Sequence, residues 1–305
     1  MIVAMAAENH GAEPPDSFQG HPMKCLPCSL AGLALIACLL GHAFASAEPA
    51  VIERVSTRSF SVPAGGILHV ETNGGVIQVR LSAGRVVTIS AKRKICADSE
   101  AQADELLKAF TLSCTQQGNE ITARAKYDGL RPMFHAGSWP PVQADFFITV
   151  PANFAVDLDS SGGRVTVGDL AGFVHAHTGG GELNLGRIGG GIEAATGGGS
   201  VWIESAENTL QASTGGGSIR AAISGAIKGD CEVRTSGGSM HLTVDRMAGF
   251  MLDAITSTSH VEIDGLPITV AKGGPGRSQL TGSVNGGGPL FRLRSDSGSI
   301  EILAR

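Results

Sequence analysis

The sequence predicts a mainly β fold: a parallel β-solenoid, a stack of Gly-rich coils of about 18–21 residues, behind a mixed α+β N-terminal cap. Three observations predict it. Thr-Gly-Gly-Gly begins at Thr178, Thr196 and Thr214, at a constant interval of 18 residues. Apolar and polar residues alternate on both sides of each glycine run, which is typical of strands with one buried face. A fixed short period of this kind indicates a chain that stacks one small unit.

The N-terminal segment predicts export. Residues 23–47 are a predicted signal peptide, because Lys24 precedes an apolar run, Leu30–Leu40, and a small-residue site, Ala45-Ser46-Ala47. We expect cleavage after this site and a location in the periplasm, the cell envelope or the extracellular space. The apolar run is shorter than the roughly 20 residues that a transmembrane helix needs, so we expect no membrane span.

Two alternatives stay open in this segment. Residues 1–22 contain no Lys or Arg and are an expected upstream extension, so that either Met1 or Met23 is the start. Leu35-Ile36-Ala37-Cys38 is similar to a lipobox, which would anchor the chain by a lipid on Cys38.

Residues 48–150 are predicted to form the N-terminal β-rich cap with one helix. Ser99 and Gln102 form a capping box ahead of a helix over about 100–110, where apolar residues recur at helical spacing. Between Asp128 and Ala144 a long loop with Met133, Phe134, His135 and Trp139 is a candidate contact site. Period-two alternation predicts strands at Val51–Val62, Ile67–Val70, Val76–Leu81 and Val86–Ala91, near Leu112, and at Glu120–Ala125 and Phe146–Val150.

Residues 151–305 predict about seven coils, each with two inward-facing strands joined by a glycine turn. Thr72 begins a further copy inside the cap, and Gly265–Gly288 interrupts the period as an inserted coil or loop. We expect the end strand, Ser299–Leu303, to be exposed and open to pairing. The turns begin at Ser160, Thr178, Thr196, Thr214, Thr235, Thr256 and Ser295.

Identical turns that stack this closely need backbone freedom, including positive φ, and leave no room for Cβ atoms, so glycine is expected in them. A Gly198→Val change is therefore expected to disrupt folding. Cys96 and Cys114 could pair in an oxidising compartment, which would contribute about 3 kcal/mol. Cys231 falls in an inward column and is expected to be a small buried hydrophobe.

Outward positions are expected to stack in the same way as inward ones. One column places Trp202 beside Arg220, His241 and Glu262, with His260 close to His241. An aromatic platform with hydrogen-bonding neighbours suits a sugar ring or a protein partner. A solvated sheet face with favourable cross-strand pairs is the alternative.

The other outward face carries Asp157 and Asp159 in one coil and His175 and His177 in the next. Two carboxylates beside two imidazoles could chelate a transition metal. Cross-strand pairing without a metal is the simpler interpretation, so no cofactor is expected.

The formal net charge of −5 excludes the concentrated basic surface of a nucleic-acid-binding protein. No catalytic triad, phosphate loop or dinucleotide fingerprint occurs, so the sequence predicts a protein that is not an enzyme. A polysaccharide-active β-helix enzyme and a purely structural envelope protein stay open as alternatives.

A resemblance supports this interpretation. The Val150-Pro151 opening, the Leu158-Asp-Ser-Ser-Gly-Gly turn and the later Thr-Gly-Gly-Gly or Thr-Ser-Gly-Gly turns resemble the bacterial putative-adhesin family, a β-strand-repeat domain of unknown function. The resemblance covers about residues 50–305. It implies an extracytoplasmic, non-enzymatic module, and it supplies no catalytic residues. From the stacked outward residues we expect this module to bind a cell-envelope glycan or protein.

Overall fold

The computed structural model describes residues 51–63, 65–130, 139–225 and 228–305. All described residues belong to one compact unit. The expected extension, the signal peptide and Cys38 lie outside the described residues, as do Met133, Phe134 and His135. Among the helices of the described ranges, none is both long and apolar enough to cross a membrane.

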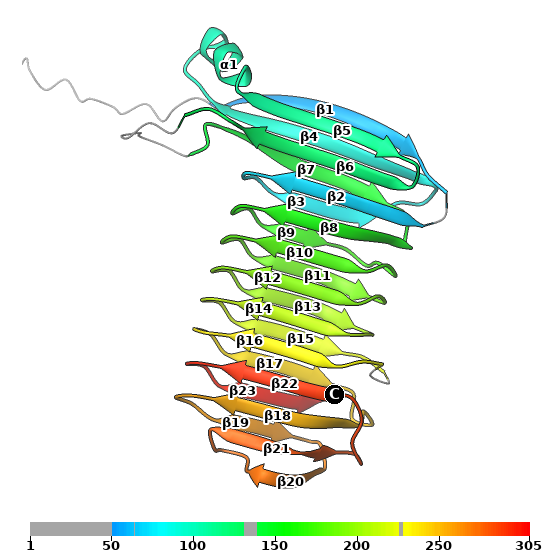
Figure 1. Cartoon of the computed structure of the whole chain (residues 1–305), viewed down its shortest axis with the longest axis vertical. Coiled ribbons are helices and arrows are strands. Elements are labelled where there is room, and N and C mark those ends of the chain that lie inside the picture. Colours follow the sequence, from blue (N-terminus) through cyan, green and yellow to red (C-terminus); the bar gives the residue numbers. More distant parts are fainter. Residues whose placement is uncertain (1–50, 64, 131–138, 226–227) are drawn as a thin grey trace, which may run out of the picture. The chain divides into compact units, whose positions relative to one another are not determined.

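The described chain is mainly β and forms two large, mostly parallel sheets (Figure 1). The 11-stranded sheet has the order β1 (Val51–Ser61), β4 (Val86–Cys96), β7 (Val142–Val150), β3 (Ile77–Leu81), β9 (Val165–Val167), β11 (Leu183–Ile188), β13 (Val201–Ala206), β15 (Ile219–Ile223), β17 (Met240–Val244), β23 (Ile300–Ala304) and β19 (Val261–Asp264). The 12-stranded sheet has the order β20 (Ile268–Gly273), β21 (Gln279–Val284), β18 (Phe250–Thr256), β22 (Leu290–Ser295), β16 (Cys231–Thr235), β14 (Leu210–Thr214), β12 (Ile192–Thr196), β10 (Val174–Thr178), β8 (Phe154–Ser160), β2 (Gly66–Thr72), β6 (Glu120–Tyr127) and β5 (Phe110–Gln117).

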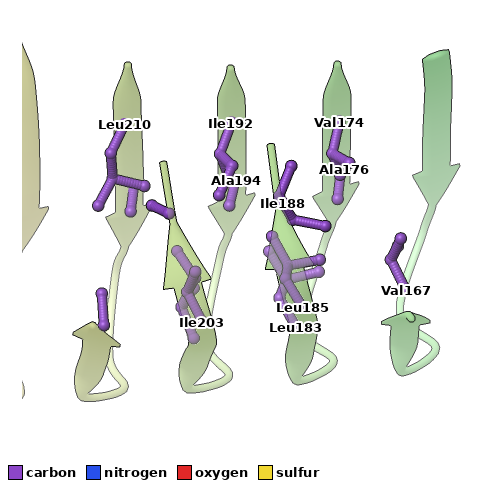
Figure 2. Close-up of a cluster of buried hydrophobic side chains, with 14 of the residues drawn as sticks. Val167, Val174, Ala176, Leu183, Leu185, Ile188, Ile192, Ala194, Ile203 and Leu210 are labelled. Atoms are coloured by element: carbon purple, nitrogen blue, oxygen red, sulfur yellow. The ribbon is translucent and has the colours of Figure 1, made fainter. Parts of the chain in front are cut away.

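The predicted register of the repeats is confirmed in both sheets. Thr178 pairs with Thr196 and Thr196 with Thr214, so equivalent residues of successive repeats lie side by side. Inward positions follow the same rule, with Val174 beside Ile192 and Leu183 beside Val201. Figure 2 shows Val174, Ile192 and Leu183 between the two rows of strands, and Val201 is buried with them. They are at most 1% exposed, and burial of each Val, Leu or Ile contributes about 1.5–3 kcal/mol.

Buried threonines join several glycine turns to the neighbouring turn in the stack. The Thr196 hydroxyl donates to the Gly181 carbonyl at 2.8 Å and accepts the Gly199 N–H at 3.2 Å. Thr214 makes the same two bonds with Gly199 and Gly217, at 2.7 and 3.2 Å. Because each hydroxyl satisfies one donor and one acceptor of the part-buried turns, Thr or Ser is favoured at the first position of the turn.

The first and third glycines of the turn that begins at Thr196 are required by the close approach of the neighbouring turn. A Cβ on Gly199 would lie 2.0 Å from the Gly181 carbonyl oxygen, and one on Gly197 would lie 2.2 Å from the Gly179 oxygen. A Cβ on Gly198 would meet nothing nearer than 4.0 Å. The reason for expecting Gly198→Val to disrupt folding, the lack of room for a Cβ, therefore does not hold at the middle glycine. None of these three glycines has a positive φ, so contact with the turn before decides where glycine is needed.

The N-terminal region continues both sheets. The expected extra copy is confirmed, because Thr72 pairs with Ser160 and Val79 with Val167. Helix α1 spans Glu100–Leu107, three residues shorter than the range expected, because the chain enters β5 at Phe110. The Ser99 hydroxyl accepts the Gln102 N–H at its N-terminus, as the capping box predicts.

The C-terminal repeat departs from sequence order. Strands β22 and β23 insert between the repeat of β16 and β17 and the repeat of β18 and β19. The segment that interrupts the period, Gly265–Gly288, contains an antiparallel pair of strands, β20 and β21, and β21 pairs with β18. The expectation that Ser299–Leu303 is an exposed end strand is wrong, because β23 pairs with β17 on one side and β19 on the other. The last strands of the two sheets are β19 and β20 at this end.

The expected Cys96–Cys114 disulfide is absent, and both residues are free thiols. Cys96 ends β4 in the 11-stranded sheet, whereas Cys114 lies on β5 in the 12-stranded sheet. Their spacing in sequence therefore does not bring them together. Burial raises the pKa of the Cys114 thiol, against a smaller lowering by the charge of Arg58. Cys231 is buried between Leu210 and Phe291, and burial raises its pKa to about 12.

Candidate functional site

One row of outward side chains crosses the 11-stranded sheet, and we call it the Trp202 row. Strand pairing places its members side by side in the order Phe147, Gln78, Thr166, Asn184, Trp202, Arg220, His241, Glu301 and Glu262. The two aromatic side chains are well exposed, Phe147 by 42% and Trp202 by 57%. Neighbouring strands lie about 4.8 Å apart, so these two rings lie about 19 Å apart.

The structure keeps Trp202, Arg220 and His241 adjacent, as expected. Glu301 replaces Glu262 as the neighbour of His241, with His241 Nδ1 2.9 Å from Glu301 Oε2. Glu262 pairs with Glu301 on the far side. The expected order was wrong at this point because the last repeat in the sequence, β22 and β23, lies between the repeat of β16 and β17 and the repeat of β18 and β19.

His260 does not lie beside His241. It precedes β19, and its carbonyl accepts the Ile300 N–H of β23. Strand β23 therefore separates His260 from β17, which carries His241. The His260 Nδ1 lies 3.4 Å from the Ser259 hydroxyl.

A shallow groove lies next to Trp202, lined by Asn184, Gly186 and Glu204 among others. Glu204 Oε1 is 2.6 Å from an Arg187 guanidinium nitrogen, and the Arg187 N–H donates to Asp169 Oδ1 at 2.9 Å. An exposed ion pair therefore lies beside the groove. A site of this kind can stack on an apolar face while it hydrogen-bonds polar groups around the edge.

Several members of this surface were missed from the sequence. Phe147 and Gln78 belong to the row because β7 and β3 pair in parallel, although 69 residues separate them. Arg187 and Glu204 lie on β11 and β13, C-terminal to the three alternating positions at which the repeats align in the sequence. Period-two alternation on β7 identifies Phe147 as an outward residue, but the sequence does not show which strand lies beside it.

The second outward face lies on the 12-stranded sheet. Asp157 pairs with His175 and Asp159 with His177, as the register predicts. Two residues missed from the sequence extend this face: His69 on β2, which pairs with Asp157, and Glu120, which begins β6. The His69 Nδ1 is 2.8 Å from Asp157 Oδ2, and its Nε2 is 3.5 Å from Glu120 Oε1.

This face does not group Asp157, Asp159, His175 and His177 as the ligands of one metal ion. His177 Nδ1 lies 3.2 Å from Asp159 Oδ1, while His175 Nδ1 lies 3.5 Å from Glu193 Oε2. Each imidazole thus faces a different carboxylate along the sheet. Across the part of the chain that the structure describes, no three His, Cys, Asp or Glu side chains are grouped to hold a metal ion. Cross-strand pairing accounts for the contacts of Asp157, Asp159, His175 and His177.

No protein-family model matches the sequence, and no curated protein matches it. Solved structures show a distant likeness. A putative adhesin from Bacteroides fragilis is 12% identical with a TM-score of 0.39, over 82% of this chain and 97% of that one. A putative cell adhesion protein from Clostridium sporogenes is 12% identical with a TM-score of 0.35, over 83% and 100%. A putative adhesin from Parabacteroides distasonis is 11% identical with a TM-score of 0.32, over 81% and 97%. Likenesses of this size carry no argument about function.

Proposed function

We propose that this chain is an exported, non-catalytic adhesion module that binds a cell-envelope glycan or protein partner through the Trp202 row. One observation carries the proposal: Phe147 and Trp202 are exposed on a single row whose other members are amide, hydroxyl and charged side chains. Aromatic faces cover the apolar face of a sugar ring or a partner side chain, and the polar neighbours supply hydrogen bonds.

The architecture in this proposal is a β-solenoid over residues 151–305, with residues 48–150 as its cap. Its support is the strand pairing, since both sheets repeat the same register every 18 residues between Val165 and Thr214. Successive repeats bury nearly identical inward residues, as stacked units do. Outward residues therefore fall into straight rows that present one side chain every 4.8 Å or so.

Export is the second part of the proposal, and its support is the leader at residues 23–47. Removal of that segment leaves a chain in the periplasm, the envelope or the extracellular space. Lipid attachment at Cys38 is the alternative anchor. Mass spectrometry of the mature N-terminus separates the two outcomes, because a lipidated chain begins at Cys38 and a secreted one at Glu48.

The absence of catalysis is the third part. Asp157 and Asp159 are i, i+2 neighbours on one strand and face the same side of the sheet. Glycoside hydrolysis requires two carboxyl groups that flank the bond, about 5–10 Å apart across a cleft. Asp157 and Asp159 instead face His69 and His177.

Co-sedimentation of residues 48–305 with cell envelopes and with purified wall polysaccharide tests the proposal. Trp202→Ala and Phe147→Ala should each reduce the bound fraction, and together they should abolish it. Phe173→Ala is the matched control, because Phe173 is 40% exposed but lies outside the row. Equal binding by all three folded variants would reject the row as the binding surface, and no binding by the unmodified protein would reject the proposal.

A further inference from the structure

A second candidate site lies away from the Trp202 row, where the turns meet the N-terminal strands. Two stacked glycine turns form one side of it, Asn73–Val76 and Ser161–Gly163. The rest of the lining comes from Lys94, Tyr127, Trp139, Pro140, Gln143 and Asp145. The pocket has a volume of about 660 Å³, within the range of roughly 300–1,000 Å³ that is typical of small-molecule sites.

An aromatic pair forms part of the pocket. The rings of Tyr127 and Trp139 meet edge to face, with centroids 5.6 Å apart and planes at 82°. Both residues are half-buried. The contact restrains Trp139 at the end of β6, so that an indole and a phenol are held at the pocket before any ligand binds.

Asp145 fixes the polar side of the pocket. Its side chain is only 6% exposed, and its two oxygens are used differently. Oδ2 lies 2.6 Å from Lys94 Nζ, while Oδ1 accepts the Val76 N–H at 2.9 Å. Asp145 therefore acts as a positioning residue that ties Lys94 to the first glycine turn. The Lys94 side chain is 40% exposed, and an ammonium has three donors, so it can also donate to a ligand.

The glycine turns leave space where other residues would fill it. The Gln143 side chain lies over Gly74, whose Cβ would be 3.5 Å from the amide carbon of Gln143. A Cβ on Gly162 would meet no heavy atom within 4 Å. Position 162 therefore lines the pocket and has room for a Cβ.

We propose that this pocket binds one or two rings of an oligosaccharide that is neutral or carries a carboxylate, through Trp139, Gln143 and Lys94. This inference rests on the proposed function, because it names a second contact of the same adhesion module. A sugar ring offers an apolar face for an indole and hydroxyl groups for an amide and an ammonium. The lining is mostly polar, which suits a sugar better than an apolar peptide side chain.

The two tryptophans allow a test that separates the pocket from the row. The chain contains Trp139 and Trp202 only, so Trp202→Phe leaves Trp139 as the sole indole in the full chain. We would titrate this variant with cellotriose, chitotriose and tri-galacturonate, and would follow tryptophan emission. The expected result is a saturable change with at least one of these sugars below roughly 10 mM, a range that detects even millimolar affinity.

A matched pair of glycine variants locates the binding. Gly162→Leu, added to Trp202→Phe, should weaken the affinity at least tenfold because it fills the pocket. Gly180→Leu is the control, since a Cβ there also meets nothing within 4 Å and Gly180 is not part of the pocket lining. Circular dichroism and melting curves confirm that both variants fold.

Three results would overturn the inference. One is an emission that no sugar changes, and another is equal affinity in the Gly162→Leu and Gly180→Leu variants. The third is a response to the tripeptide Gly-Phe-Gly without a response to any sugar, which would make the pocket a peptide site. Envelope binding that persists in these cases would leave the proposed function standing, because Trp202→Ala tests the row independently.

Discussion

Two adjacent glycines in one turn provide a sharp test of how the repeats stack. Gly199→Ala and Gly198→Ala make the same chemical change one residue apart. A Cβ on Gly199 would lie 2.0 Å from the Gly181 oxygen, whereas real Cβ atoms essentially never come within 3.0 Å of another heavy atom. The two turns must therefore separate by about 1 Å. A Cβ on Gly198 meets nothing nearer than 4.0 Å.

The magnitude follows from the hydrogen bonds that this separation strains. The Gly181 oxygen accepts the Thr196 hydroxyl at 2.8 Å, and Thr196 in turn accepts the Gly199 N–H. Loss of one or both bonds among buried groups costs about 2–5 kcal/mol in the free energy of unfolding. Gly198→Ala should change it by less than about 1 kcal/mol, in the stabilising direction, because alanine restricts the unfolded chain.

Urea unfolding followed by circular dichroism gives the comparison. Under identical conditions, the midpoint of Gly199→Ala should fall well below that of the unmodified chain, while the midpoint of Gly198→Ala should equal or exceed it. Equal midpoints for the two variants would refute the reasoning, because the clash would then have no energetic consequence.

Three further predictions concern the buried hydroxyls, the buried thiol and the Trp202 row. Thr214→Val should lower the free energy of unfolding by about 2–4 kcal/mol, since the Gly199 carbonyl and the Gly217 N–H lose their partner, while Thr214→Ser should cost much less in the same urea assay. Burial raises the pKa of Cys231 to about 12, so the folded chain keeps a proton that the unfolded chain loses above roughly pH 8.5. Stability should therefore fall as the pH rises from that value toward 12, and Cys231→Ala should fall less steeply; parallel curves would contradict this assignment. Exchange of two row residues, Trp202→Arg with Arg220→Trp, should leave the unfolding midpoint within error and change envelope binding, and a large loss of stability would show that the row contributes to folding.

Much of the repeat architecture could be predicted because stacking imposes it on the sequence. Equivalent residues such as Val174, Ile192 and Leu210 must occupy the same inward place in successive repeats, so the 18-residue interval appears directly in the chain. The position of Thr196 follows from the same rule, since its hydroxyl bonds the turn before it.

The order of the repeats could not be predicted, because the same rule makes them interchangeable. Strand β22 presents Phe291 and Leu293 to the core, and β18 presents Leu252 and Ala254 at the same places. Both repeats fit beside β16, and their inward residues do not decide which one binds there. The antiparallel strands β20 and β21 occupy the far side of β18 and place β22 between β16 and β18. The errors at Glu262, His260 and the end strand all follow from this one insertion.

The candidate sites were harder to predict than the fold for a related physical reason. Inward positions, the first Thr or Ser and the third glycine of each turn are constrained by packing and by backbone contact, and these residues carry the period. Outward positions such as those of Trp202 and Arg220 contact solvent and one neighbour on each side, so stacking leaves their identity free. A residue that stacking does not select can be selected by a ligand, which makes departures from the period the best indicator of function. Phe147 and Trp139 illustrate the limit of that indicator, because both lie in the region before the regular repeats. Only the pairing of β7 with β3 and the contact of Trp139 with Tyr127 show what they face.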